Sequence, residues 1–347
     1  MKAIASFGHT IRNSLREINN PIRRSVYDKF TWFNNRINRL SLTVSGRGCK
    51  SDTCVMCPLP SYRNTTFSNE IILQAINREI ESYKGNIDML SLYTDGSYYD
   101  RRELDVELRE AIEELVAIND ISIFNIETLP SKFPEEEIVK TKERTKALLL
   151  INVGLQSSNS DIRKYCIGSP FTDSHLKRMI RIKTQHNIKL RGYLLFKPPF
   201  LSEHEAMLDL KKSIKYCVEN KYDIISINPC KVAKGTLLEY LYNKKYYFLS
   251  HYFSIAKVIS EMEEINSVRV EMPSSDGCPG DIALPHICEK CSGVWENTKI
   301  NKSFSVNPSC WDIHMKHESN AGNWQDLAER FWKSEAGKTL INKHEQS

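Results

Sequence analysis

Three cysteines in one short segment are the residues whose types and spacing most directly suggest chemistry. Cys49, Cys54 and Cys57 lie in LTVSGRGCKSDTCVMCPLP, at the end of the apolar run Leu40–Val44. Three thiolates in one loop can hold three irons of a [4Fe–4S] cluster and leave the fourth iron open to a substrate or cofactor. Zinc is the alternative, but it normally takes four protein ligands. No other Cys or His lies within ten residues of this loop, so the spacing favours the iron–sulfur cluster.

A second group of possible metal ligands lies near the C-terminus. It comprises Cys278, His286, Cys288, Cys291 and Cys310, and the pair Cys288–Cys291 has the spacing of a metal-binding knuckle. Zinc that holds a core-poor segment together is the first interpretation. An auxiliary [4Fe–4S] cluster and free thiols are the alternatives. The remaining cysteines, Cys166, Cys217 and Cys230, stand alone in the sequence and are predicted to be small buried apolar residues.

Apolar runs alternate with amphipathic stretches through the middle of the chain. The expected strands are Leu40–Val44, Met89–Tyr93, Ile121–Ile126, Ala147–Val153, Lys189–Phe196 and Ile224–Asn228. The expected helices are Glu70–Tyr83, Glu103–Ile118, Glu135–Lys142, Asp173–His186 and Glu203–Asn220. This alternation predicts an α/β fold with a parallel sheet and outer helices. Six such units predict a partial (β/α)6 barrel, with the chemistry at the C-terminal ends of the strands.

Composition divides the chain into three regions. Residues 1–37 form a basic N-terminal extension, 38–262 form the barrel, and 263–347 form a small irregular C-terminal domain with the second Cys/His group. In this last region Asn323–Lys338 has the pattern of an amphipathic helix. Residues 1–48 hold nine Lys or Arg against two Asp or Glu. Such a stretch either binds nucleic-acid phosphates or is a solvated surface.

Length and charge exclude other classes. The 347 residues contain no apolar run of about 18 residues, which argues against an integral membrane protein. The first 20 residues have no apolar core of a secretory signal, so a cytoplasmic location is expected. Ten cysteines in such a chain favour metal or redox chemistry over disulfides. A net charge of +5 neither requires nor excludes a nucleic-acid partner.

Several stretches carry a resemblance to a known family. They are GRGCKSDTCVMC, YTDGSYYD, GLQSSNSDIRKYCIG, GYLLFKPPFLSEHEA and ISINPCKVAKGTLLEYLY. Together they resemble radical SAM enzymes, within the elongator-related group that includes the radical SAM subunit of archaeosine synthase. The resemblance implies that S-adenosylmethionine (SAM) binds the open iron and is cleaved to a 5′-deoxyadenosyl radical. In such enzymes the protein binds and orients the cofactors, and the cofactors carry out the cleavage of SAM.

Polar residues at the other strand ends are candidates to hold this cofactor. Gly96 lets the backbone approach a ligand closely, and the resemblance implies that Asp95–Ser97 bind the SAM amino group. It also implies that the end of the fourth strand and Arg163 bind SAM, with the planar Arg163 fork near its carboxylate. The candidate cofactor residues are Asp95, Gly96, Ser97, Glu127, Gln156, Ser157, Arg163, Lys197 and Asn228.

Some of these candidates have open alternatives. By its position, Glu127 could hold the SAM ribose or the substrate, and Lys197 could pair with an anionic group. For Asn228 a substrate contact and a turn are both compatible with the sequence. For Arg163 the alternative is a surface charge on a helix.

Three functions are compatible with the sequence. The first, implied by the resemblance, is cleavage of a C–N bond in a lysine-modified 7-deazaguanine of tRNA, with a partner subunit. The second is a radical SAM enzyme of small-molecule or peptide natural-product biosynthesis. The third is a zinc-containing nucleic-acid-binding module without catalysis. Both enzyme functions need a reductant protein such as flavodoxin or ferredoxin.

Overall fold

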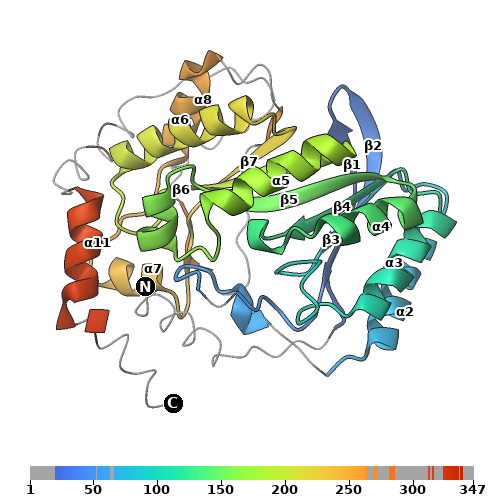
Figure 1. The fold of residues 1–347 in the computed structure, drawn as a ribbon. Coiled ribbons are helices and arrows are strands. Elements are labelled where there is room, and N and C mark those ends of the chain that lie inside the picture. Colours follow the sequence, from blue (N-terminus) through green and yellow to red (C-terminus); the bar gives the residue numbers. More distant parts are fainter. Residues whose placement is uncertain are drawn as a thin grey trace.

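The chain folds around one curled, mostly parallel sheet (Figure 1). The computed structural model describes residues 20–263 except 52 and 63–65, and also 269–271, 281–285, 312, 315, 323–335 and 337–338. The sheet has eight strands in the order β1-β2-β3-β4-β5-β6-β7-β9. Strand β1 pairs antiparallel with β2, and every later pair is parallel. The strands are β1 (Ile22–Trp32), β2 (Asn35–Val44), β3 (Met89–Tyr93), β4 (Ile123–Thr128), β5 (Leu148–Gln156), β6 (Lys189–Phe196), β7 (Ile224–Pro229) and β9 (Arg269–Glu271).

Helices cover the outside of this sheet (Figure 1). They are α2 (Asn69–Glu81), α3 (Val106–Ile118), α4 (Glu135–Thr145), α5 (Asp173–His186), α6 (Glu203–Glu219) and α8 (Tyr252–Glu261). Helices α7 (Leu237–Asn243) and α11 (Trp324–Lys333) lie to one side of the sheet, where Tyr240 contacts Phe331. Short helical turns occur at η1 (Leu59–Tyr62), η2 (Pro130–Lys132) and η3 (Ile162–Ile167). A ribbon of β8 (Val232–Ala233) and β10 (Asp281–Ala283) completes the described structure. Among the described residues, no helix is long and apolar enough to cross a membrane.

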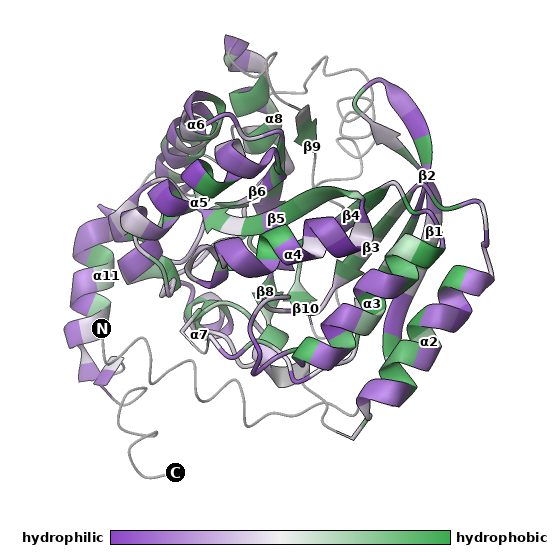
Figure 2. Cartoon of the chain, turned by 45° about the vertical axis from the view of Figure 1, so that its right-hand side comes forward, coloured by the Kyte–Doolittle hydropathy of each residue, from purple (hydrophilic) through white to green (hydrophobic). Residues whose placement is uncertain are grey.

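The main core lies between the sheet and the helices. Alternate strand residues such as Leu92, Phe124 and Ile151 point outward and are fully buried. They pack in one cluster with helix residues such as Ile76 and Ile112. The helices therefore carry both hydrophobic and hydrophilic residues around their axes in Figure 2, as expected for amphipathic helices on a sheet.

The other face of the strands points into the barrel and is layered. The lower end of the barrel lies at the N-terminal ends of the strands. An apolar plug there is formed by Met89, Ile123, Leu150 and Ile224, with Phe30, Trp32, Ile37 and Leu148 packed against them. Two residues farther along each strand, the inward residues are polar and buried: Ser91, Asn125, Asn152, Arg191 and Ser226. The next inward positions reach the C-terminal strand ends. The barrel interior is thus apolar at the N-terminal ends of the strands and polar toward their C-terminal ends. A ligand would bind at the C-terminal ends.

The predicted α/β partial barrel is confirmed, with instructive differences at the element ends. Strands β3 and β6 and helix α5 have the predicted bounds. Strands β4 and β5 run on to Thr128 and Gln156, because backbone pairing with the neighbouring strands continues beyond the predicted apolar runs. Helix α3 begins at Val106 rather than Glu103, because the Glu103 carboxylate instead accepts backbone N–H groups of a neighbouring loop.

The structure adds strands outside the predicted barrel range. Strand β1 comes from the basic extension, and β9 and β10 come from the predicted C-terminal region. Strand β1 was missed because it is an edge strand whose polar residues face solvent on one side. The predicted domain limits at residues 37 and 262 stay predictions.

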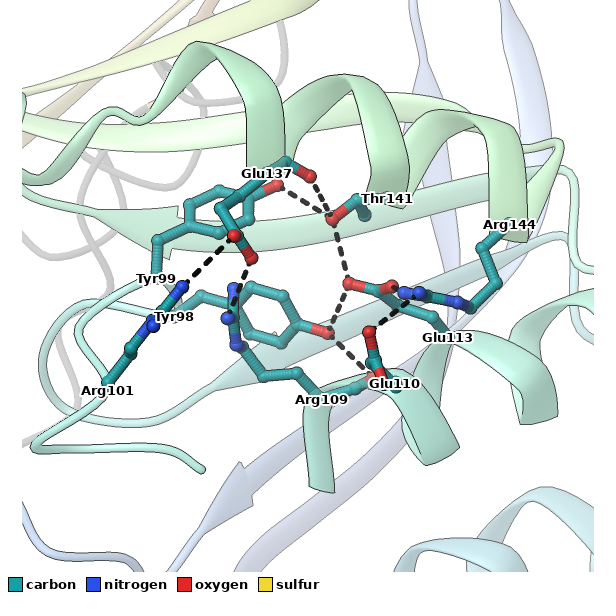
Figure 3. A network of polar contacts seen from close by, with 9 residues as sticks. All are labelled: Tyr98, Tyr99, Arg101, Arg109, Glu110, Glu113, Glu137, Thr141 and Arg144. Carbon is teal, nitrogen blue, oxygen red and sulfur yellow. Dashed lines mark hydrogen bonds and ion pairs between the residues drawn. The ribbon is translucent and has the colours of Figure 1, made fainter. Parts of the chain in front are cut away.

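A network of charged groups joins α3 to α4 (Figure 3). Arg109, whose side chain is 3% exposed, donates to Glu137 at 2.9 Å. Glu113, 2% exposed, accepts from Thr141 at 2.8 Å and also pairs with Arg144. These contacts join two helices on the outer side of the sheet, so we interpret the network as structural.

Replacing Arg109 by alanine tests this interpretation. The variant leaves Glu137 without its buried partner, and we expect the free energy of unfolding to fall by about 3 kcal/mol in chemical denaturation. Arg101 is the matched control, because it contacts the same carboxylate at 3.4 Å with a side chain that is 71% exposed. Arg101→Ala should cost less than about 1 kcal/mol. Equal losses in the two variants would contradict the structural role.

Candidate functional site

The three cysteines of the first loop line one cavity. This cavity has a volume of about 380 Å³ and lies at the C-terminal ends of the parallel strands. Cys49, Cys54 and Cys57 all face it. The loop is anchored by buried Val55, whose N–H donates to the Ile167 carbonyl at 3.0 Å and whose carbonyl accepts the Leu237 N–H at 2.8 Å. The parallel topology therefore brings the predicted cluster ligands to the predicted edge of the sheet.

The chemistry of these thiols fits a metal centre. Burial raises the pKa of Cys54 to about 11 and that of Cys57 to about 12, and it raises the pKa of Cys49 further. Buried thiolates need a compensating positive charge, which bound iron or zinc supplies. In the described part of the chain, no three His, Cys, Asp or Glu side chains converge as the ligands of one ion would. Three thiolates on three irons of a cluster need only line the same cavity, so the arrangement fits the cluster better than zinc.

Gly96 lies between the cysteine loop and a buried carboxylate. A Cβ at this position would lie 1.9 Å from Glu103 Oε2 and 3.1 Å from the Cys49 Cα. Glu103 cannot move aside easily, since its carboxylate accepts the backbone N–H groups of Lys50, at 2.6 Å, and Ser97. Burial raises the pKa of Glu103 to about 7. Only glycine fits here, and the bare backbone of Gly96 is left facing the cavity.

A second carboxylate fixes the same loop from β4. Glu127 accepts the backbone N–H groups of Thr94 and Asp95, both at 2.9 Å, and burial raises its pKa to about 7. Asp95 adopts a left-handed conformation, with φ of 60°, and pairs with Arg23 from β1. Holding a non-glycine residue in this region needs support from its surroundings. Glu127 and Arg23 provide that support.

The structure gathers many of the predicted cofactor residues around the cavity. Gln156, which ends β5 in a left-handed conformation, hydrogen-bonds the Cys54 thiol. Asn228 lines the cavity from β7. The predicted residues that line it are Cys49, Cys54, Cys57, Asp95, Gly96, Glu127, Gln156 and Asn228.

The other predicted residues lie behind the cavity wall. Among the described residues, Ser97, Ser157, Arg163 and Lys197 are buried and do not line the cavity. Ser97 Oγ accepts the Leu129 N–H at 2.9 Å, and Lys197 lies 3.1 Å from the Glu203 carboxylate. Arg163 donates to the Ser157 carbonyl at 2.7 Å and pairs with Asp173. A cofactor role for these four residues stays a prediction.

Other lining residues were not singled out from the sequence. Asn152 and Tyr193 face the cavity from the interiors of β5 and β6, and Lys231 and Asp281 lie on either side of the β8–β10 ribbon, 3.7 Å apart. The signal for Asn152 and Tyr193 was the alternation along each strand, which places them on the same face as the strand-end residues. Asp281 comes from a distant segment that carries no local signal.

The second group of possible metal ligands lies outside the described residues. This applies to Cys278, His286, Cys288, Cys291 and Cys310, and their role as a zinc or cluster site stays a prediction. By contrast, Cys166, Cys217 and Cys230 are described. All three are buried, as predicted, and Cys230 also lines the cavity.

Comparisons with known proteins agree with this geometry. No family model matches the chain. It is 28% identical over 279 residues to an uncharacterised protein of Methanocaldococcus jannaschii, covering 78% of this chain and 76% of that protein. It is also 28% identical over 292 residues to archaeosine synthase subunit beta of Methanosarcina acetivorans, covering 79% of this chain and 82% of that protein.

A solved structure shares the fold. Elp3 of Methanocaldococcus infernus aligns with a TM-score of 0.50 and 17% identity over 68% of this chain and 60% of that chain. The chain has an Elp3-like fold, and its sequence is similar to archaeosine synthase subunit beta. The predicted resemblance is confirmed. The alignment spans less than two thirds of the Elp3 chain, so it supports the shared barrel alone.

The close packing around Gly96 generates a prediction about assembly of the expected cluster. Gly96→Ala should push Glu103 and the backbone of Cys49 apart, so the reconstituted variant should hold much less iron and sulfide than the wild type reconstituted in parallel. Gly46→Ala is the matched control, because a Cβ there would meet only the Glu103 carbonyl oxygen at 3.8 Å. Iron and sulfide per chain are the measurement. Wild-type values in Gly96→Ala would contradict the argument.

The buried carboxyl group of Asp209, which contacts Ser157, generates a prediction about how stability depends on pH. Burial raises the pKa of Asp209 to about 6, although the Ser157 hydroxyl donates to it at 2.7 Å. An unfolded Asp titrates near pH 3.9, so the folded protein binds this proton more tightly. Binding of this proton to Asp209 contributes fully to stability below about pH 4, and the contribution is lost as the pH rises through about 6. Asp209→Asn should therefore match the wild type near pH 4 and exceed its free energy of unfolding by about 2 kcal/mol at pH 8.

Denaturation curves at both pH values measure this difference. Asp161→Asn is the control, because Asp161 is exposed and the substitution should leave the pH dependence unchanged. An Asp209→Asn curve that runs parallel to the wild-type curve from pH 4 to pH 8 would contradict the prediction.

Proposed function

We propose that this protein binds a [4Fe–4S] cluster through Cys49, Cys54 and Cys57 and uses it to cleave SAM. The observation that carries the proposal is that these cysteines share one strand-end cavity with Gly96 and Gln156. When bound, the cluster supplies one electron to the SAM sulfonium, which releases methionine and a 5′-deoxyadenosyl radical. The protein's task is to bind, orient and exclude water from these groups.

Each lining residue has a defined part in this proposal. The bare backbone at Gly96 gives the SAM amino group close access beside Cys49, and Glu103 holds that backbone in place. Glu127 keeps the Thr94–Asp95 N–H groups fixed, so the Asp95 loop is already arranged before SAM binds. Gln156 connects the end of β5 to Cys54 and thereby couples the SAM site to the cluster loop.

For the substrate, we propose a lysine-modified 7-deazaguanine in tRNA, in which the radical removes a hydrogen from the lysine part and a C–N bond breaks. The support is the relatives named archaeosine synthase subunit beta, from Methanosarcina acetivorans and Thermococcus kodakarensis. A partner subunit and a reductant such as flavodoxin or ferredoxin belong to this proposal. Exposed Arg24, Lys29 and Arg36 on the β1–β2 hairpin are available for phosphates, whereas Arg23 is engaged by Asp95.

Anaerobic reconstitution tests the cofactor part of the proposal. With SAM and dithionite, the wild type should form 5′-deoxyadenosine, and Cys54→Ala should lose at least about a hundredfold of this activity because one iron loses its protein ligand. Cys217→Ala is the control, since Cys217 is a buried cysteine that lies between sheet and helices and does not line the cavity. Zinc binding with intact SAM would refute the proposal and favour a nucleic-acid-binding module.

Addition of tRNA tests the substrate part. Substrate tRNA should accelerate 5′-deoxyadenosine formation, and its binding should weaken steeply with salt. Formation of 5′-deoxyadenosine that tRNA does not affect would leave the cofactor chemistry in place and reject tRNA as the substrate.

A further inference from the structure

Asn152 is a buried amide whose polar atoms have no partner. It lies inside β5, with 0% of the residue exposed. Neither its side-chain nitrogen nor its side-chain oxygen forms a hydrogen bond within the described part of the chain. The side chain lines the cavity that the cysteines share. Buried amides are normally hydrogen-bonded, so an amide left open toward a cavity points to a ligand that completes it.

The position of Asn152 separates it from the predicted SAM site. Asn152 pairs with Arg191 of β6 and Gln156 pairs with Leu194, so Asn152 lies three β6 residues, about 10 Å, farther down the sheet at the usual rise per residue. Gln156 contacts Cys54 at the level of the cysteine loop. Asn152 therefore lies at the floor of the cavity, close to the apolar plug formed around Leu150. A molecule that reaches this floor extends beyond the groups that bind the cluster and SAM.

The chemistry of the floor defines what it can recognise. A neutral amide presents a donor and an acceptor side by side, so it pairs with a planar group that presents the complementary pair. Arg191, the register partner of Asn152 on β6, is buried but does not line the cavity. Tyr193 and Leu195, which do line it from β6, are an aromatic and an apolar residue. The surroundings thus suit an uncharged, flat heterocycle better than a phosphate or carboxylate.

We infer that Asn152 binds the donor–acceptor edge of the substrate base at the floor of the cavity. This assignment rests on the proposed function, because it takes the base to be the group on which the radical chemistry acts. Asn152 is then a specificity-determining residue: it selects bases that have such an edge and fixes the depth at which the base is held. A site built to hydrogen-bond one group discriminates strongly against analogues that lack it.

Asn152→Leu tests the inference with readouts that a structural role would not produce. It removes the unpaired amide at similar volume, so the denaturation midpoint should rise rather than fall. The affinity for SAM should stay at the wild-type value, because Asn152 lies below the groups proposed to bind SAM. The kcat/KM for substrate tRNA should fall by about tenfold to a hundredfold.

Asn125→Leu is the matched control. Asn125 occupies the same polar layer on β4, but its amide donates to Ser91 Oγ at 2.9 Å and it does not line the cavity. This variant should lower the denaturation midpoint, through the lost hydrogen bond, and leave the KM for tRNA unchanged. A midpoint that falls in both variants, or a SAM affinity that falls in Asn152→Leu, would overturn the assignment.

A direct binding measurement separates this inference from the proposed function. The probes are free 7-deazaguanine, which has the donor–acceptor edge, and indole, a flat bicycle of similar shape that lacks it. Wild type should bind 7-deazaguanine, Asn152→Leu should bind it at least about tenfold more weakly, and indole should bind both proteins equally. This result supports the assignment even if no SAM is cleaved, which would refute only the proposed function. Equal binding of 7-deazaguanine to both proteins would overturn the assignment even if SAM is cleaved.

Discussion

Parallel pairing of the strands from β2 to β9 is the constraint on which the site depends. Because each strand runs in the same direction, every C-terminal strand end reaches the same edge of the curled sheet. Residues more than a hundred positions apart, such as Cys49 and Asn228, therefore line one cavity. The helices supply most of the buried apolar surface on the outside, so the inner face is free to carry polar groups that would weaken an ordinary core.

Two buried carboxylates show how the strand-end loops are held. Glu103 and Glu127 both use their oxygens to accept backbone N–H groups, and both lie beside the loop that contains Gly96. Their role differs from that of Glu113 and Glu137, which pair with arginines on the outer side of the sheet. A carboxylate that binds backbone amides fixes a loop in one conformation, whereas one that binds an arginine joins two helices.

The sequence was sufficient for the barrel and for the cysteine loop. The pattern of apolar and polar residues predicted β3, β6 and α5 with their bounds, and Thr172 and Asn187 cap the two ends of α5. It missed β1, whose exposed side carries polar residues, and it placed Glu103 in a helix because the loop that binds this carboxylate is distant in sequence. Asn152 lies within a mostly apolar strand, so it does not stand out in the sequence, although strand alternation places it on the same face as the strand-end residues.

The apolar plug beneath the polar layer has a consequence for the depth of the cavity. Within the described barrel it closes the lower end of the interior, with Phe30 and Trp32 of the β1–β2 hairpin packed against it. A molecule that contacts Asn152 therefore does not enter through this end of the barrel. The plug gives the cavity a fixed depth, so the size of a bound molecule is limited on the side that lies opposite the cysteine loop.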